Sequence, residues 1–146
     1  MAAHEDIRAL IRRHMEEMWH ARQPQVIAET THAHRATHGL TDDAIHGHEQ
    51  HTEVIRAHQE AFSDLHFRID HLIVEGEWAA ARVVMRGRHT GAFMGIAATG
   101  KEVTVSVLRL DHVQDGKIAQ TILEWDKLNL LQQLGVPLKL PGQPQS

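Results

Sequence analysis

Residues 65–86 read LHFRIDHLIVEGEWAAARVVMR, and this stretch decides the fold. Apolar and polar residues alternate with a period of two on both sides of Glu75-Gly76-Glu77, which is the pattern of two strands joined by a turn. The residues that share a face are Leu65, Phe67, Ile69, His71 and Ile73 on the first strand, and Ala79, Ala81, Val83 and Met85 on the second. The stretch therefore predicts an antiparallel β-hairpin.

The chain before this hairpin has a helical period instead. From Ile7 to Trp19, apolar residues recur every three or four positions with charged residues between them, which predicts an amphipathic helix. A short second helix is expected around residues 26–27, and a third follows Gly47 and includes Phe62. Residues 30–46 have no period, so they are expected to form a loop or an irregular edge.

The chain after the first hairpin predicts a second one, with strands over residues 103–113 and 117–125, and then a short helix. Helices, two hairpins and a closing helix make an α+β order. Because long strands curl as they twist, helices on one face leave a concavity. We expect one α+β domain over residues 1–136, whose N-terminal helices cover a curved antiparallel sheet and enclose a pocket, followed by a proline-rich tail over residues 137–146.

The composition of the chain argues against several classes of function. The 146 residues carry a net charge of -4 without a basic stripe, so nucleic acid is not an expected partner. The chain has no cysteine, no apolar stretch of membrane-spanning length and no apolar segment at its N-terminus, and a cytoplasmic location is the expectation. Of its 14 histidines, half lie between residues 32 and 58.

Residues 87–101 read GRHTGAFMGIAATGK, and this glycine-rich segment resembles the SnoaL-like polyketide cyclase family of the nuclear transport factor 2-like superfamily. Three further stretches agree with the family in the same order. They are AFSDL at 61–65, DGKI at 115–118, and Asp126 followed by LLQQLG at 130–135. Ala97 stands where the family usually has proline.

The resemblance, which runs from about residue 5 to residue 136, implies a cone-shaped fold with a metal-free pocket for a polycyclic ester or similar ketide and no cofactor. Cyclases of this family close a ring by intramolecular aldol condensation, with an aspartate as general acid/base and a histidine on the neighbouring strand. When the family motif is aligned without a gap, the aspartate position falls on Leu123 and the histidine position on Arg109. Neither catalytic group is present at its family position.

The register of the second hairpin indicates which side chains replace them. A three-residue loop at Gln114-Asp115-Gly116 would place Arg109 opposite Thr121, Val107 opposite Leu123 and Val105 opposite Trp125. These six side chains share one face, which by resemblance is the concave one. The predicted wall is therefore apolar with a single cation.

Two residues are candidates for catalysis, and each has two interpretations. Asp126 is either a relocated acid/base or the N-cap of the last helix. Arg109 either clamps a carboxylate or enolate oxygen of a ligand or pairs with Asp111 on the same face. The candidates for contact with substrate, some of which are equally core or loop residues, are Trp19, His38, His46, Phe62, His89, Met94, Val107, Leu123 and Trp125.

The histidine-rich segment could offer imidazoles to zinc, copper or nickel, or its histidines could be adventitious. The sequence shows no pair of histidines four residues apart on a helix together with a third ligand, so we expect no metal site.

Three functions follow from these observations. The first is an enzyme of the cyclase or isomerase type, acting on a small apolar ketide or ester, with its catalytic activity left open by the missing aspartate. The second is a non-catalytic module that binds a small apolar or aromatic acid through Arg109. The third is a homo-oligomeric scaffold, most simply a dimer, which buries the convex residues Ser106, Leu108, Leu110, His112 and Ile122.

Overall fold

A computed structural model describes residues 3–20, 25–139 and 141–142, and it confirms the predicted α+β class. Of the predicted tail, residues 140 and 143–146 lie outside this part. The elements in chain order are the helices α1 (His4–Met15), η1 (Glu16–His20) and α2 (Gln25–Thr30), the strands β1 (Thr31–His38) and β2 (Ile45–His46), the helix α3 (Gly47–Ala61), the strands β3 (Phe62–Glu75), β4 (Trp78–His89), β5 (Glu102–Gln114) and β6 (Lys117–Trp125), and the helix α4 (Lys127–Gln133).

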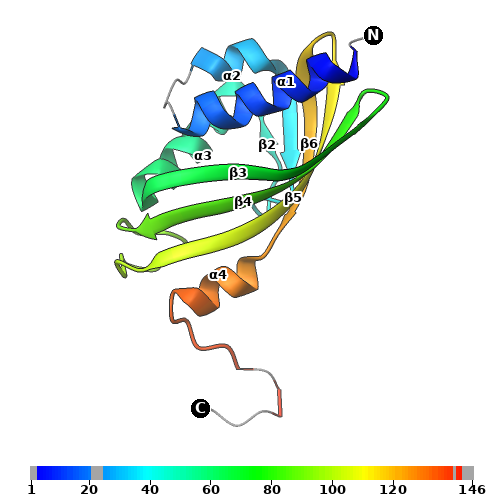
Figure 1. Cartoon of the computed structure of the whole chain (residues 1–146). Coiled ribbons are helices and arrows are strands. Elements are labelled where there is room, and N and C mark those ends of the chain that lie inside the picture. The colour runs from blue at the N-terminus through cyan, green and yellow to red at the C-terminus, as the bar shows by residue number, and fades with distance from the viewer. Residues whose placement is uncertain (1–2, 21–24, 140, 143–146) are drawn as a thin grey trace.

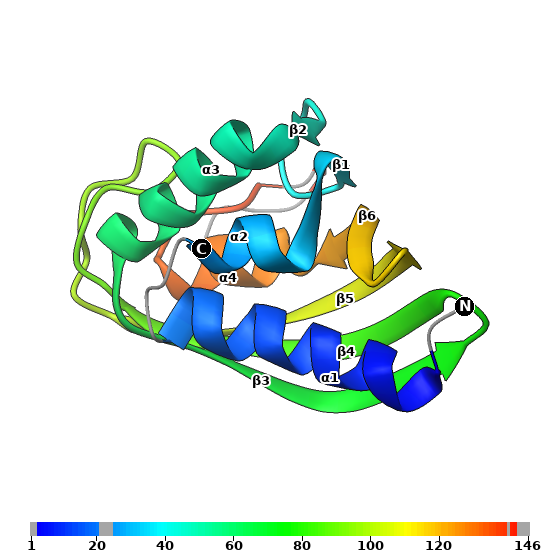
Figure 2. The same cartoon turned by 90° about the horizontal axis from the view of Figure 1, so that it is seen from above.

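The strands form one curved sheet in the order β2-β1-β6-β5-β4-β3. Figures 1 and 2 show that it bends around the N-terminal helices, with β3 and β4 beside α1 and with β6, β1 and β2 on the other side of the bend. All neighbouring strands are antiparallel except β1 and β6, which are parallel. The prediction of a curved sheet beneath N-terminal helices is confirmed, with this parallel pair as an addition.

Residues 31–38 differ from the sequence-based expectation, because they form a strand and not a loop or irregular edge. The inward positions of β1 carry Arg35 and Thr37, which are buried polar residues, so no apolar alternation marks the strand. Pairing with β6 supplies the backbone hydrogen bonds that local sequence preference does not indicate. The strand ends at Gly39, where a Cβ would lie 1.8 Å from the carbonyl oxygen of Leu123, so β1 approaches β6 too closely for a side chain.

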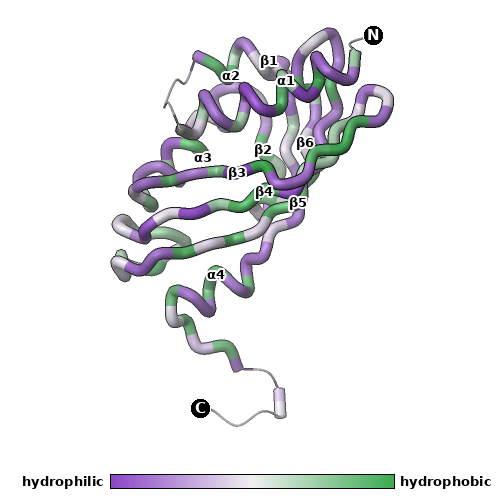
Figure 3. The backbone as a smooth tube through the Cα atoms, viewed as in Figure 1, coloured by the Kyte–Doolittle hydropathy of each residue, from purple (hydrophilic) through white to green (hydrophobic). Residues whose placement is uncertain are grey.

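The helices place their apolar faces on the concave side of the sheet. Ile7 and Ile11 of α1 pack with Val74 and Val113, and Met15 packs with Val83 further along. The hydropathy colouring of Figure 3 alternates along the strands, as a sheet with one covered face requires. The α4 helix packs separately, against β5 at the far end of the sheet.

The structure differs from the prediction at two element boundaries, the end of the first helix and the start of β3. The first helix does not run as an α-helix to Trp19, because it widens after Met15 into the π-helical turn η1. Such turns are frequent at functional sites, because they re-aim side chains. Phe62 begins β3 and does not belong to α3, since its backbone is already extended.

The β5–β6 register corrects the predicted pairing by two residues. Arg109 lies opposite Leu123, and Val107 lies opposite Trp125. One residue of the shift comes from a tighter turn, in which Asp115 and Gly116 both have positive φ and Gln114 pairs with Lys117. The other comes from a bulge in β6 between the pairs Val113–Ile118 and His112–Gln120. A shift of two preserves the side-chain face, so the predicted inner residues remain inner.

Candidate functional site

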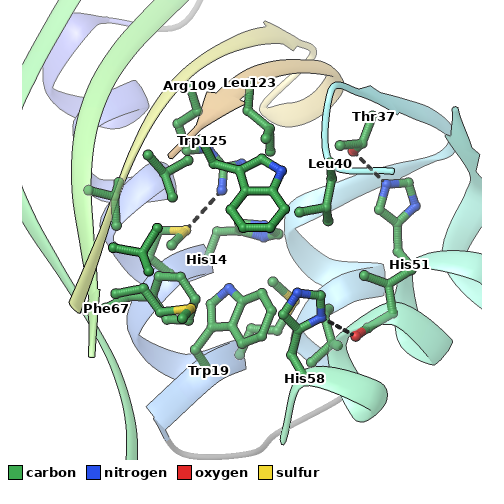
Figure 4. Close-up of a pocket in the computed structure, with 18 of the residues that line it drawn as sticks. His14, Trp19, Thr37, Leu40, His51, His58, Phe67, Arg109, Leu123 and Trp125 are labelled. Carbon is green, nitrogen blue, oxygen red and sulfur yellow. Dashed lines mark hydrogen bonds between the residues drawn. The ribbon is translucent and has the colours of Figure 1, made fainter. Parts of the chain in front are cut away.

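A cavity of about 90 Å³ lies between the helices and the concave face of the sheet. Its wall is mostly apolar: η1 contributes Met18 and Trp19, β4 contributes Val83, and β6 contributes Leu123 and Trp125. Figure 4 shows the two tryptophan side chains pointing into the same space. The volume is below the several hundred Å³ that are common for small-molecule sites, so a larger ligand needs side chains to move.

Five of the residues singled out from the sequence lie in this wall. They are Trp19, Val107, Arg109, Leu123 and Trp125. Strand geometry explains four of them, because every second side chain of a strand lies on the same face of the sheet. Residues 107 and 109 of β5 and residues 123 and 125 of β6 lie on the concave face for this reason. Trp19 joins them from η1 and packs against Phe67, with ring centroids 4.5 Å apart and the ring planes tilted by 37°.

The other candidates lie outside the wall. His38 and His46 are exposed. Phe62 and His89 are buried next to each other in the core, with ring centroids 5.6 Å apart. Met94 sits in the loop after β4 and is 45% exposed.

Asp126 is the N-cap of α4, which is one of the two roles that the sequence left open. Its carboxylate accepts a hydrogen bond from the backbone N–H of Asn129 at 3.1 Å, as an N-cap of α4 does. Asp126 is exposed, and it is not part of the cavity wall. We therefore assign it to the helix cap.

Arg109 pairs with Asp111, as one of its two interpretations predicted. Its Nε and one terminal nitrogen each donate to Asp111 at 2.7 Å, which makes a two-point ion pair in which Asp111 is fully buried. The other terminal nitrogen, Nη1, lies 3.0 Å from the sulfur of Met15, a weak acceptor. Arg109 thus has a carboxylate partner and still presents one poorly satisfied donor at the cavity.

A second buried arginine joins this network, and the sequence did not indicate it. Thr121 lies opposite Asp111 in the β5–β6 register and donates its hydroxyl proton to that carboxylate at 2.6 Å. The same hydroxyl oxygen accepts from two nitrogens of Arg35, at 2.8 and 3.1 Å. Within the described part of the chain, Arg35 has no carboxylate at ion-pair distance, so one carboxylate serves two guanidinium groups.

This end of the cavity is therefore cationic, and the pKa values reflect it. Burial, together with the charge of Arg109, lowers the pKa of Arg35 to about 9. Burial alone would raise the pKa of Asp111, but Arg109, Arg35 and the Thr121 hydroxyl outweigh it and hold that pKa below its usual value. Asp111 is ionised at neutral pH, and the wall carries a net positive charge that a ligand oxygen could balance.

Three histidines line the cavity that sequence reasoning did not place there: His14, His51 and His58. Burial lowers the pKa of each, and for His51 the pKa falls to about 4. One signal was available for His14, because it lies on the apolar stripe of the first helix beside Ile11 and Met15. The same signal was available for His58, which the sequence places with Val54 and Ile55 on one side of the third helix, whereas His51 could not be separated from its histidine-rich surroundings.

The remaining histidines do not assemble a metal centre. No group of three or more His, Asp or Glu side chains with suitable geometry occurs among residues 3–20, 25–139 and 141–142. His32 and His34 stack on each other at 4.9 Å, and His48 contacts the carbonyl oxygen of Thr31 at 3.0 Å. In the same residues, no helix combines the length and hydropathy that crossing a membrane requires.

Comparison with known families gives one match over most of the chain. A family model described as SnoaL-like polyketide cyclase matches residues 9–134. Two similar proteins are aklanonic acid methyl ester cyclases, DnrD of Streptomyces peucetius and AcmA of Streptomyces galilaeus. The first is 36% identical over 67 residues, which cover 45% of this chain and 46% of DnrD. The second is 39% identical over 62 residues, which cover 42% of each chain. The matched segments thus span less than half the length of these relatives.

Solved structures agree over nearly the whole length. TsrD of Streptomyces laurentii superimposes with a TM-score of 0.85 at 26% identity, covering 93% of this chain and 99% of TsrD. IdmH of Streptomyces antibioticus superimposes with a TM-score of 0.78, also at 26% identity, covering 91% of this chain and all of IdmH.

Proposed function

Because this chain belongs to the SnoaL-like polyketide cyclase family, we propose that it binds a small apolar ketide or ester in the cavity and closes a ring in it by acid/base chemistry. The similarity to aklanonic acid methyl ester cyclases supports a keto ester as the substrate class. The proposed chemistry, an intramolecular aldol condensation, uses protein groups alone.

The position of Arg109 carries the proposal. Its Nη1 group lies in the cavity wall, where its one partner among the described residues is the thioether of Met15, and the apolar side chains around it weaken competition from water. In an aldol closure, negative charge develops on an enolate oxygen, and a positioned donor in a low-dielectric site stabilises that charge strongly. Asp111 holds the guanidinium by two hydrogen bonds, so Arg109 needs no reorganisation when substrate arrives.

A second candidate function is a binding module without turnover. The presence of Leu123 at the position of the family's aspartate favours it, because leucine cannot take a proton. The two functions differ in one measurement. Incubation with a cyclisable keto ester, followed by NMR spectroscopy of the products, gives a ring-closed isomer for the enzyme and unchanged ester for the binding module.

The binding step is tested by thermal shift with ethyl 2-methylacetoacetate and ethyl benzoylacetate. A ligand that binds the folded state raises the melting temperature of the wild type. Arg109→Met alone leaves Asp111 as a buried unpaired charge, which costs about 3–5 kcal/mol of folding stability. A change in the melting temperature of this variant would therefore mix the loss of binding with the loss of stability. The informative variant is Arg109→Met/Asp111→Leu, which removes both charges of the pair.

We expect the double variant to fold, as judged by near-ultraviolet circular dichroism, and to lose the ligand-induced shift. A folded double variant with the same shift as the wild type would remove Arg109 from the binding site. If neither ester shifts the wild type, the proposal of a keto ester ligand fails.

We also propose that the protein is a homodimer that buries its convex face. This face exposes large apolar side chains, among them Leu108 at 59% and Leu110 at 44%. Contiguous exposed apolar residues of this kind mark interaction surfaces.

A further inference from the structure

We propose that His14 is the general base of the site and that its Nε2 atom removes a proton from a carbon flanked by two carbonyl groups. The inference rests on the proposed function, because it assigns the proton acceptor that Leu123 and Asp126 do not supply. His14 belongs to α1, is 1% exposed and lines the cavity. Figure 4 shows it in the same space as Arg109, Trp19 and Trp125.

The hydrogen bonds of His14 fix its tautomer. Nδ1 lies 2.9 Å from the hydroxyl oxygen of Thr30. That hydroxyl has a single proton, which it donates to the carbonyl oxygen of Val26 at 2.7 Å. The Thr30 oxygen must therefore accept from His14, so Nδ1 carries the ring proton and Nε2 carries a free lone pair.

The lone pair on Nε2 distinguishes His14 from the buried His89, whose Nε2 also has no partner among the described residues but carries the ring proton and lies outside the cavity wall. Nε2 of His14 is buried and has no hydrogen-bond partner in the described part of the chain. By contrast, both ring nitrogens of His51 are satisfied: Nδ1 donates to the carbonyl oxygen of Gly47 at 2.6 Å, and Nε2 accepts from Thr37 at 2.7 Å. A buried acceptor without a partner is unfavourable for folding alone, which points to a role toward a ligand.

The surrounding charges set the strength of this base. His14 interacts electrostatically with Arg35 of β1, Arg109 of β5 and His51 of α3, and each interaction lowers its pKa. Asp111 compensates part of the arginine charge. Burial first, and then these cations, lower the pKa of His14 well below its usual value. At neutral pH the ring is uncharged and ready to accept a proton, but it is a weak base. Its substrate must therefore have an acidic C–H bond, as a 1,3-dicarbonyl compound does.

The step balances without a co-reactant. Nε2 takes the proton, the C–H electron pair forms the C=C bond of an enolate, and the former carbonyl oxygen carries the negative charge beside Nη1 of Arg109. The enolate carbon then attacks a third carbonyl carbon, elsewhere in the same molecule, and the new alkoxide takes the proton back from Nε2. The two guanidinium groups disfavour the imidazolium, which promotes this return.

The tautomer can be measured without any substrate, by ¹⁵N NMR of the histidine rings at pH 7. We expect His14 to be protonated at Nδ1 and bare at Nε2. His89 is the internal control, because the Thr99 N–H donates to its Nδ1 at 3.2 Å and so its proton belongs on Nε2. A protonated Nε2 on His14 would overturn the inference whatever the ligand is.

Base activity is measured as deuterium exchange at the single C–H between the carbonyl groups of ethyl 2-methylacetoacetate in D₂O. His14→Asn removes the ring base while its amide N–H can still donate to Thr30. We expect this variant to lose about 100-fold or more of the protein-catalysed exchange. The matched control is His71→Asn, a histidine with a side chain that is 74% exposed, which should exchange at the wild-type rate.

A third variant, His58→Asn, tests the nearest competitor, since His58 Nδ1 contacts the carbonyl oxygen of Val54 and its ring also lines the cavity. Loss of exchange in His58→Asn with full exchange in His14→Asn would overturn the inference. So would a wild type that gains thermal stability from the ester but exchanges only at the background rate, and in that case the proposed binding function survives. A wild type that neither binds nor exchanges the ester contradicts the proposed function itself.

Discussion

At the scale of single residues, the unusual feature is a cavity wall in which some buried polar groups lack a strong hydrogen-bond or ion-pair partner. Asp111 accepts directly from Arg109 and is linked to Arg35 through Thr121, while Nη1 of Arg109 and Nε2 of His14 have no strong partner among the described residues. Folding stability alone would favour apolar residues at these positions, since buried charge is costly to desolvate. The network therefore supports the proposed role of the cavity in binding or chemistry.

The cavity histidines predict that acid destabilises the fold. His14, His51 and His58 have pKa values below that of an unfolded histidine, about 6.5, so the unfolded state binds more protons below that pH. Stability is then complete above pH 6.5 and is lost as the pH falls toward the folded values, about 4 for His51. We expect a loss of about 2 kcal/mol or more between pH 7 and pH 4.5, measured by urea unfolding.

His51→Asn provides the check on this pH dependence. Protonation of His51 removes the lone pair that accepts from Thr37, so the variant should lose less stability over the same pH range than the wild type. Asp111 contributes little over this range, because its pKa is lowered in the folded state and its contribution is lost mainly below the pKa of an unfolded aspartate, about 3.9. An unfolding free energy that is constant from pH 7 to pH 4.5 would contradict the assignment of buried neutral histidines.

At the scale of elements, α4 closes the cavity at the end of the sheet. It is only Lys127–Gln133, too short to be stable by itself, and it depends on its cap and on packing. Leu130 packs into the cluster that contains Phe62 and Val105, and it also lines the cavity. The hydrogen bond of Asp126 thus supports the wall from outside the site.

Substitutions at Asp126 separate a cap from a catalytic acid/base. Asp126→Ala removes the acceptor for the Asn129 N–H and should lower the free energy of unfolding by about 1 kcal/mol. Asp126→Asn keeps a good cap and should unfold like the wild type. Because we assign no proton transfer to this residue, both variants should retain wild-type deuterium exchange at saturating ester. Loss of exchange in Asp126→Asn, with stability unchanged, would return the residue to the catalytic site.

At the scale of the whole molecule, the sheet has two different faces. The concave face holds the cavity, while a row of neighbouring residues crosses four strands of the convex face. The row consists of Ile73, Ala80, Leu110 and Ile122, which pair in this order from β3 to β6. The sequence predicted that Ile73 shares a face with Phe67 and Ile69, but a bulge between Ile69 and His71 shifts the alternation of β3 by one residue and turns Ile73 outward. Ile73 is 65% exposed and Ile122 is 36% exposed, so a second copy could cover a continuous apolar strip.

A charge placed in this row tests the dimer. We expect the wild type to be dimeric by size-exclusion chromatography with light scattering, and Leu110→Lys to be monomeric, since a buried lysine at a self-complementary interface meets its own copy or apolar surface. Leu128→Lys is the matched control, because this α4 residue is 57% exposed and lies away from the row. A wild type that is monomeric at all concentrations, or a Leu110→Lys variant that stays dimeric, would contradict the proposal.

The sequence alone indicated the class of fold, the hairpins and which side chains of β5 and β6 share a face, while the family resemblance indicated that this face is the inward one. The first three follow from local properties: the period of apolar residues, the conformations that Asp115 and Gly116 favour, and the strict alternation of a pleated strand. The same properties identified Arg109, Leu123 and Trp125 as neighbours, because an error of two residues in register does not change the face.

The tertiary structure alone decided which polar groups meet. The strand β1 has no apolar period, and its pairing with β6 is what brings Arg35 to Thr121 and Asp111. The bulge in β6 sets the register that places Thr121 opposite Asp111, and the packing of α1 against α2 gives His14 its partner Thr30. Hydrogen bonds extend over about 3 Å, so they depend on the relative placement of distant segments, which no local pattern in the sequence specifies.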